Sequence, residues 1–193
     1  GLGGGVYLKG DDCIYKLKKG QIEDNEANNG GGVYLENGSF ILAPDQGDNG
    51  SILGNIASSK GGGVYIADGG DFTMRGGTVA GNSTQNGNGG GIFLDGGSFY
   101  QTNGKINGNV AKTNGGGVCI MNNGNFTMSN GEITQNGMLQ AGGDAVTVNG
   151  GGVYLDGGAL NVEAGSISDN GSVENGGGVY IMNGTVAMGS GKI

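Results

Sequence analysis

One hexapeptide pattern recurs along this chain: three glycines, an aliphatic residue, an aromatic residue and a second aliphatic residue. The glycine triplets begin at Gly3, Gly30, Gly61, Gly89, Gly115, Gly150 and Gly176. Neighbouring triplets are roughly 25 to 35 residues apart, a period typical of solenoids. Because such a unit cannot bury its apolar side chains alone, the pattern predicts a stack of similar coils, a β-solenoid.

The glycine content bears on whether the chain folds at all. Glycine makes up 50 of the 193 residues, and chains this rich in glycine are commonly disordered because glycine loses the most backbone entropy on folding. Here the glycines recur in register, Pro44 is the only proline, and every unit carries alternating aliphatic residues. Collagen is excluded because glycine does not fall at every third position. The composition therefore favours an ordered repeat.

Each unit contains three short segments in which apolar and polar residues alternate. In the third unit they contain Val64, Phe72 and Val79, separated by Gly, Asn or Asp. Alternation with turn residues between the segments predicts strands, and a helical repeat is excluded because each interior glycine costs a helix about 1 kcal/mol. We predict an all-β fold, a parallel β-helix of about seven coils of three short strands, one coil for each triplet.

An asparagine follows the third segment of each complete unit. This column consists of Asn25, Asn55, Asn82, Asn109, Asn136 and Asn170. Asparagine tolerates the left-handed backbone conformation and bonds neighbouring backbone groups, and stacked amides can bond from coil to coil. We predict a structural ladder here and no ligand site.

The alternation places the aromatic residue of the repeat on the outer surface. This column consists of Tyr7, Tyr34, Tyr65, Phe93, Cys119, Tyr154 and Tyr180. As an exposed stripe, it would stack sugars or pack against another chain. Alternatively, it is a cross-strand ladder that stiffens the sheet. The sequence leaves both interpretations open, so the aromatic members are the candidate interface or glycan-binding residues.

Charge and residue content exclude several functions. The formal net charge is −8 and histidine is absent, so we expect neither nucleic-acid binding nor an imidazole-based catalytic or metal site. Cys13 and Cys119 lie four coils apart, roughly 19 Å at the usual strand spacing, and should not pair within one chain. No apolar stretch is long enough for a transmembrane helix, so we expect no membrane insertion by this segment.

Aspartate carboxylates are the remaining candidates for catalytic groups. When the units are aligned, Asp68, Asp95 and Asp156 share the turn after the first segment. Residues stacked one coil apart would have the spacing of a retaining glycosidase pair. Asp-Gly is also ordinary turn chemistry, and we expect no catalytic residue here.

Two insertions, 43–49 and 137–149, interrupt the repeat and predict longer loops, which often carry binding in solenoids. The first holds Asp45, Asp48 and Asn49, a conceivable calcium cluster without the spacing of a known calcium loop. We expect no cofactor and no metal site, with calcium at this insertion as the alternative.

The asparagine and glycine motifs occur together. Ile22-Glu23-Asp24-Asn25-Glu26-Ala27 stands before Gly30-Gly31-Gly32-Val33-Tyr34, and Ile106 to Ala111 stands likewise before Gly115 to Val118. The chain thereby resembles, over nearly its whole length, the right-handed parallel β-helix repeats of bacterial surface proteins, of the polymorphic outer-membrane protein and autotransporter-adhesin passenger type. The resemblance implies a right-handed β-helix and a bacterial surface protein. Pectate-lyase-like enzymes share the coil shape, but their calcium-binding Asp set and catalytic Arg or Lys have no convincing counterpart in this chain.

These observations lead to two functional hypotheses. The first is a non-enzymatic, extracellular or bacterial cell-surface protein, a rigid structural or adhesive rod that contacts its own copies, other surface proteins or glycans. Assembly end to end into filaments is a variant, because uncapped solenoid ends expose strand edges. The alternative is a polysaccharide-binding or pectate-lyase-like polysaccharide-degrading protein. We expect residues 1–193 to form a single solenoid domain, a fragment or mature product without terminal caps.

Overall fold

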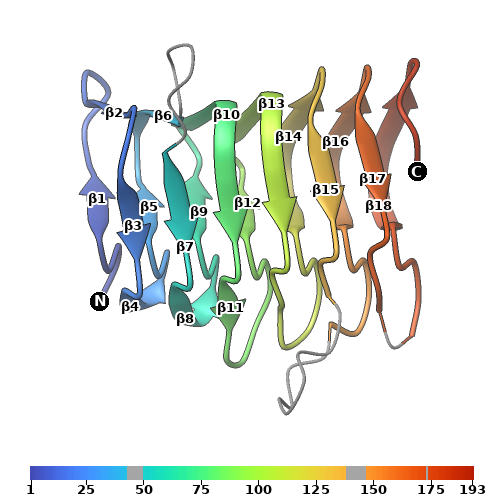
Figure 1. Ribbon diagram of the computed structural model, residues 1–193, viewed down its shortest axis with the longest axis horizontal. Coiled ribbons are helices and arrows are strands. Elements are labelled where there is room, and N and C mark those ends of the chain that lie inside the picture. Colours follow the sequence, from blue (N-terminus) through green and yellow to red (C-terminus); the bar gives the residue numbers. More distant parts are fainter. Residues whose placement is uncertain (43–49, 138–146, 173) are drawn as a thin grey trace.

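The computed structural model describes residues 1–42, 50–137, 147–172 and 174–193. Every regular element in these residues is a β-strand, and none of them forms a helix long and apolar enough to cross a membrane. The chain winds through about six turns, close to the predicted seven coils. Successive coils stack along one axis, with the two termini at opposite ends (Figure 1). The predicted all-β parallel β-helix is confirmed.

The first face of the stack carries the segments that follow the glycine triplets. Its strands are β1 (Val6–Leu8), β5 (Val33–Leu35), β9 (Val64–Ala67), β12 (Ile92–Asp95), β14 (Val118–Met128), β16 (Val153–Val162) and β18 (Val179–Met188). Each pairs in parallel with the next. The register places like residues on each other, as where Val33 pairs with Val64. The repeat in the sequence is therefore a repeat in space.

The second and third faces follow the same rule. Their other strands are β2 (Ile14–Leu17), β3 (Gln21–Glu23), β6 (Gly38–Leu42), β7 (Ser51–Leu53), β10 (Gly70–Ala80), β13 (Ser98–Asn107), β15 (Glu132–Thr134) and β17 (Ser166–Ser168). The sequence predicted three short strands per coil, but several of the observed strands are longer. For example, β10 and β13 continue from the second face into the third. Glycine allows this: Gly77 turns the backbone at φ 76°, while Thr78 N still donates to Gly50 O of the coil before.

A fourth, narrow side precedes the triplets in the first three coils. It consists of β4 (Glu26–Asn29), β8 (Ile56–Lys60) and β11 (Ser83–Thr84), which form a separate three-stranded sheet. The sequence did not predict it, because its buried positions hold the small residues Ala27, Ala57 and Thr84, which give little hydrophobic contrast.

The core is a set of stacked columns inside the coil. Phe40, Phe72, Phe99 and Phe126 are fully buried, and their successive ring centroids lie 5.4, 5.0 and 4.5 Å apart. Burying each such side chain stabilises the fold by about 1.5–3 kcal/mol. One polar residue, Gln101, occupies an inner position that Met74 fills one coil earlier.

The asparagine column forms hydrogen bonds from coil to coil. Asn82 Oδ1 accepts from the backbone N and from Nδ2 of Asn55, both at 2.9 Å. Asn82 Nδ2 in turn donates to Ile52 O at 3.0 Å and to Asn109 Oδ1 at 2.9 Å. Asn55, Asn82, Asn109 and Asn136 are fully buried. Each buried amide of this column therefore has partners on both sides.

The left-handed conformation at this corner belongs to the residue before the asparagine, and not to the asparagine as the sequence suggested. The residues that precede the ladder asparagines have φ values of 54–63°, and none of the six asparagines has a positive φ. These preceding residues are Asp24, Gly54, Gly81, Gly108, Gln135 and Asp169. A turn one residue earlier leaves the asparagine side chain free to point beneath the glycine triplet.

Glycine is required at each position of the triplet for a different reason. In the third coil, Gly61 has φ 65°. A Cβ on Gly62 would lie 2.3 Å from Gly90 O, and a Cβ on Gly63 would lie 3.1 Å from the Asn82 amide. The triplet is therefore a left-handed turn, a close approach between coils and a surface that fits the asparagine ladder.

Replacing a ladder residue should destabilise the fold strongly. Asn82→Ala leaves two donors of Asn55 without an acceptor, so we expect the free energy of unfolding to fall by about 3 kcal/mol. Asn86→Ala is the matched control, because Asn86 is exposed and bonds only Ser58 O at 3.2 Å; we expect a change within about 0.5 kcal/mol. Chemical denaturation followed by circular dichroism measures both, and equal losses would contradict the ladder's importance.

Two glycine variants separate close approach from backbone conformation. Gly62→Ala should lower the free energy of unfolding by about 3 kcal/mol, because the new methyl group would meet backbone oxygen atoms. Gly81→Ala should cost only about 1 kcal/mol, because its Cβ would have its nearest neighbour at 3.9 Å and only the positive φ opposes it. The same denaturation assay tests this order, and a greater loss for Gly81→Ala would refute it.

Candidate functional site

The outer aromatic column of the first face is largely buried. Tyr65, Phe93 and Tyr154 are 7%, 0% and 5% exposed, whereas Tyr7 at the end of the stack is 43% exposed. The ring centroids of Tyr34 and Tyr65 lie 4.6 Å apart, and those of Tyr65 and Phe93 lie 5.4 Å apart. Along the middle of the stack the column is therefore not the exposed stripe that one interpretation of the sequence required. Its geometry is that of a cross-strand aromatic ladder.

Side chains from the two flanking columns cover these rings. Lys60 Nζ lies 4.8 Å from the centroid of Phe93 and 4.0 Å from an Asp95 carboxylate oxygen. On the next coils, Asn88 Nδ2 lies 3.9 Å from Met121 Sδ. The sequence could not show this cover, because it depends on residues before and after the strand meeting above it.

Two hydroxyl groups of the column donate to acidic neighbours. Tyr65 donates to the Asp95 carboxylate, and Tyr7 donates to Glu36. Burial first, and then this hydrogen bond, raise the pKa of Tyr65 above its ordinary value, and burial likewise raises the pKa of Tyr34 and Tyr154. These phenols are accordingly neutral hydrogen-bond donors at ordinary pH.

The cysteines carry no obvious chemistry. Cys13 and Cys119 are both free thiols. Cys119 takes the aromatic position in its coil and is fully buried, and burial raises the pKa of its thiol. A protonated, buried thiol is a poor nucleophile.

The structure does not pair the acidic residues that the sequence placed in one turn. Asp95 lies opposite Ala67 on one side and Met121 on the other, so Asp68 is displaced by one residue and Asp156 is two coils away. The displacement arises because the turn holding Asp68 has one residue more than the turn after Asp95. Asp68 and Asp95 are therefore not directly opposite each other on neighbouring strands, as the glycosidase-like pair would require.

The residues considered for calcium binding lie in a segment that the structure does not describe. Asp45, Asp48 and Asn49, and most of the second insertion, lie outside the described residues. Among the residues that are described, no three His, Cys, Asp or Glu side chains gather in a way that could hold a metal ion.

A second asparagine ladder runs beside the triplets, and the sequence interpretation missed it. Asn175 Nδ2 donates to Asn149 Oδ1 at 2.9 Å, and Asn149 Nδ2 donates to Asn114 Oδ1 at 3.1 Å. Lys60 takes the equivalent position directly before the third triplet, and the buried Oδ1 of Asn29, directly before the second triplet, has no hydrogen-bond partner. The signal was present as an asparagine directly before most triplets.

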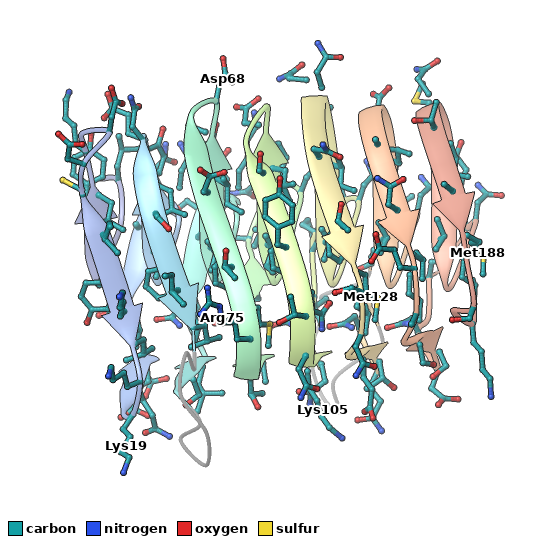
Figure 2. All side chains as sticks on the ribbon, turned by 90° about the horizontal axis from the view of Figure 1, so that it is seen from above. Lys19, Asp68, Arg75, Lys105, Met128 and Met188 are labelled. Carbon is teal, nitrogen blue, oxygen red and sulfur yellow. The ribbon has the colours of Figure 1, made fainter. Side chains whose placement is uncertain are left out.

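A hollow on the described surface lies at the corner between the second and third faces. It is a groove of about 350 Å³ lined by Asn103, Gly104, Lys105, Asn130, Gly131, Glu132, Gly165 and Ser166. A neighbouring hollow of about 260 Å³ shares three of these residues and continues to Thr78 on the preceding coil. We call this continuous feature the second-corner groove. Figure 2 shows Asp68 and Lys105 at opposite edges of the second face, so the groove is remote from the turn that holds Asp68.

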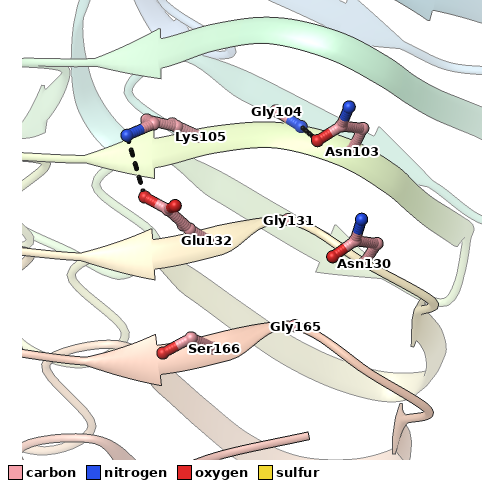
Figure 3. A pocket seen from close by; sticks show the side chains of 8 residues that line it. All are labelled: Asn103, Gly104, Lys105, Asn130, Gly131, Glu132, Gly165 and Ser166. Atoms are coloured by element: carbon pink, nitrogen blue, oxygen red, sulfur yellow. Dashed lines mark hydrogen bonds and ion pairs between the residues drawn. The ribbon is translucent and has the colours of Figure 1, made fainter.

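The lining of the second-corner groove is polar and nearly neutral. Lys105 and Glu132 pair across neighbouring strands at 2.9 Å. In Figure 3, Asn103 and Asn130 stand on one side of the glycines, and Lys105, Glu132 and Ser166 stand on the other. The groove offers amide, hydroxyl and backbone groups for hydrogen bonding, and the sequence interpretation did not single out any of these residues.

Comparison with known proteins agrees with this architecture. A family model described as right-handed β-helix region matches residues 2–188. No curated protein and no solved structure matches the chain.

The buried phenols predict a loss of stability at alkaline pH. Their pKa values are raised in the folded state, so the native chain keeps protons that the unfolded chain releases from about pH 10 upward. The stabilisation is complete below that pH and falls as the pH rises further. Denaturation midpoints measured between about pH 8 and pH 11 should therefore fall at the alkaline end. Tyr65→Phe removes one titrating group and should make this fall shallower; an unchanged slope would contradict the assignment.

Proposed function

The chain belongs to the right-handed β-helix family, and we propose that it is a non-enzymatic structural or adhesive protein that acts as a rigid rod at a bacterial cell surface. The observation that supports the proposal is that the same interactions continue from coil to coil along the stack. Strand pairing, the hydrophobic columns and the asparagine ladder run from coil to coil through the described stack. A fold alone does not establish function, so the proposal depends on what this regularity does mechanically.

Continuity makes the stack resistant to bending and shear. Each coil is tied to the next by backbone bonds at the triplet, such as Gly62 N to Gly89 O at 3.0 Å, and by an asparagine bond on the opposite side of the same corner. Sliding one coil would break both sets and move each aliphatic residue out of its column. A repeat of this kind transmits force along its axis, as a surface rod or an adhesin stalk requires.

The outer surface offers little that resembles a catalytic centre. Within the described ranges, Asp68 and Asp95 are out of register, Glu36 and Glu132 pair with lysines, and Asp95 accepts a hydrogen bond from Tyr65. Glu36, Glu132 and Asp95 thus have structural partners, which supports a non-enzymatic role. Polysaccharide degradation is the competing hypothesis, and turnover of any polysaccharide by the purified protein would favour it.

The two end faces of the described stack expose side chains whose columns are buried elsewhere. Tyr15 at the first coil is 37% exposed, and Ile181 and Met188 at the last coil are each 49% exposed, although their columns are buried elsewhere. The asparagine ladder begins at Asn25, whose Oδ1 can accept, and ends at Asn170, whose backbone N–H can donate. We extend the proposal to head-to-tail association of copies into filaments, in which one end supplies the next coil for the other.

A charged residue on one end face should block this association. Ile181→Lys would bury an unpaired charge, which costs about 3 kcal/mol or more and should weaken association at least about 100-fold. Tyr100→Lys is the control, because Tyr100 is 43% exposed on the side of the stack and should leave association unchanged. Sedimentation velocity and electron microscopy over a concentration series provide the readout. Wild-type protein that stays monomeric at high concentration would exclude filaments and leave the rod proposal to mechanical tests.

A further inference from the structure

We propose that Asn103 is a site of spontaneous covalent modification, at which water converts the side-chain amide into a carboxylate. Asparagine is one of the thermally labile residues, and this reaction is fastest where glycine follows, because glycine places no side chain beside its own backbone nitrogen. Asn-Gly recurs at the corners of this chain, and the structure sets Asn103-Gly104 apart. The proposal is independent of the rod and filament proposals, since it concerns the chemistry of a single coil.

The reaction is an intramolecular attack followed by hydrolysis. The backbone nitrogen of Gly104 forms a bond to Cγ of Asn103, and Nδ2 leaves as ammonia with the proton that the Gly104 nitrogen loses. The product is a five-membered succinimide ring. Water then opens the ring at either carbonyl carbon, which gives aspartate or isoaspartate, the isomer whose main chain runs through the side chain. The net change consumes one water and releases one ammonia, so it requires no oxidant and no cofactor.

The amide of Asn103 lies against the nitrogen that attacks it. Gly104 N donates to Asn103 Oδ1 at 2.8 Å, a contact that Figure 3 marks, and Cγ is the atom bonded to that oxygen. Asn103 is exposed, so water reaches both the amide and the ring that replaces it. Holding two reacting groups this close removes much of the entropy cost of bringing them together. The folded geometry therefore favours attack at this residue.

The fold requires glycine at the attacking position. Gly104 has φ 94°, a backbone conformation that favours glycine, and a Cβ on this residue would lie 2.8 Å from Gly77 O on the preceding coil. The carbonyl oxygen of Gly104 accepts from Gln101 Nε2 at 3.1 Å, which fixes the glycine from the side of the core. The corner that needs glycine for its backbone thereby also preserves the reactive dipeptide.

The asparagine ladder holds the same two groups in contacts that oppose the reaction. Asn136 also precedes a glycine, but it is fully buried and its Nδ2 donates to Ile106 O at 2.8 Å. The nitrogen of Gly137, which would have to attack, donates to Asn109 O at 2.8 Å. Neither group can approach the other without breaking these bonds. Hydrogen bonding therefore protects the ladder from a reaction that would remove its amide donors.

Modification at Asn103 changes both the charge and the backbone of its corner. Aspartate would add a negative charge in register with Arg75 on β10. Isoaspartate would add one atom to the main chain of β13, just before Lys105, which is in register with Thr78 and Glu132 on the neighbouring strands. The added atom would disturb this parallel pairing. We therefore expect the fourth coil to loosen as isoaspartate accumulates.

Two other asparagines of the same protein serve as internal controls. Asn130 occupies the corresponding position one coil later, is exposed and also precedes a glycine, but Figure 3 shows no contact between its amide and the glycine nitrogen that follows. Asn107 lies on the same strand as Asn103, and the glycine nitrogen after it donates to Thr134 O at 3.3 Å. Asn130 therefore tests the effect of the close contact, and Asn107 tests protection by a backbone hydrogen bond.

Peptide mapping by mass spectrometry tests the proposal on the 193-residue protein, incubated at mildly alkaline pH and sampled over days. Cleavage after Lys105 separates Asn103 from Asn107, and the spectra of the fragments locate the modified residue. We expect the Asn103 amide to be lost at least about tenfold faster than that of Asn130 or Asn107. Similar rates at the three residues, or an unmodified Asn103, would overturn the proposal.

The same measurement in urea separates the fold from the local sequence. The unfolded chain loses the close contact, so the three rates should become similar, and a preference for Asn103 that persists in urea would refute the structural argument. Asn103→Gln would have to form a six-membered ring, which closes more slowly, and should stop the reaction at this position without changing Asn130. Unchanged loss of the amide in this variant would also contradict the assignment.

A stability measurement tests the expected loosening. Asn103→Asp carries the charge of the product without the added backbone atom, and its denaturation midpoint should stay close to that of the fresh protein. Aged protein enriched in isoaspartate should denature at a lower urea concentration. Equal midpoints for the aged protein and Asn103→Asp would refute the effect on the fourth coil.

Discussion

The close contact between the glycine triplet and the asparagine ladder is the constraint on which the rest of the structure depends. A Cβ on Gly63 would lie 3.1 Å from the amide of Asn82, and a Cβ on Gly62 would meet the backbone of the next coil. The asparagine in turn binds the coils on both sides. Neither motif is useful alone, because the amide needs a surface without side chains and the bare backbone needs a partner that holds its register. Together they set the spacing at which the phenylalanine and aliphatic columns can stack.

Because successive coils have similar cross-sections, the residues at any one position of the repeat form a row along the molecule. The glycine at the second corner becomes the floor of a groove, and the aromatic position becomes a ladder. Departures from the repeat are then the informative positions. Gln101 puts a polar group beneath the groove, Lys60 interrupts the second asparagine ladder to cover Phe93, and Cys119 takes an aromatic position. We expect any activity specific to this chain at such departures, because every coil needs the regular columns for packing.

Much of the fold could be predicted because its periodicities are strict. The four stacked phenylalanines and the aliphatic columns follow from alternation, and the ladder follows from the constant position of its asparagines. The burial of Tyr65 and Phe93 could not be predicted in this way, because the side chains that cover them come from outside the strand. The offset between Asp68 and Asp95 arises from a single extra residue in one turn, which the alignment of motifs conceals. The second-corner groove escaped notice for a related reason: its residues are ordinary turn residues, and only the path of the backbone makes them a hollow.

By itself, the sequence determined that the chain is a stack of parallel coils, which residues face inward, and that glycine and asparagine hold the corners. These properties depend on periodicity within one unit, and each unit repeats the same local information. The tertiary structure alone decided which outer residues are accessible, which carboxylates are neighbours and where the surface is hollow. Those properties depend on distances between side chains of different coils, and a shift of one residue in a turn is enough to change them.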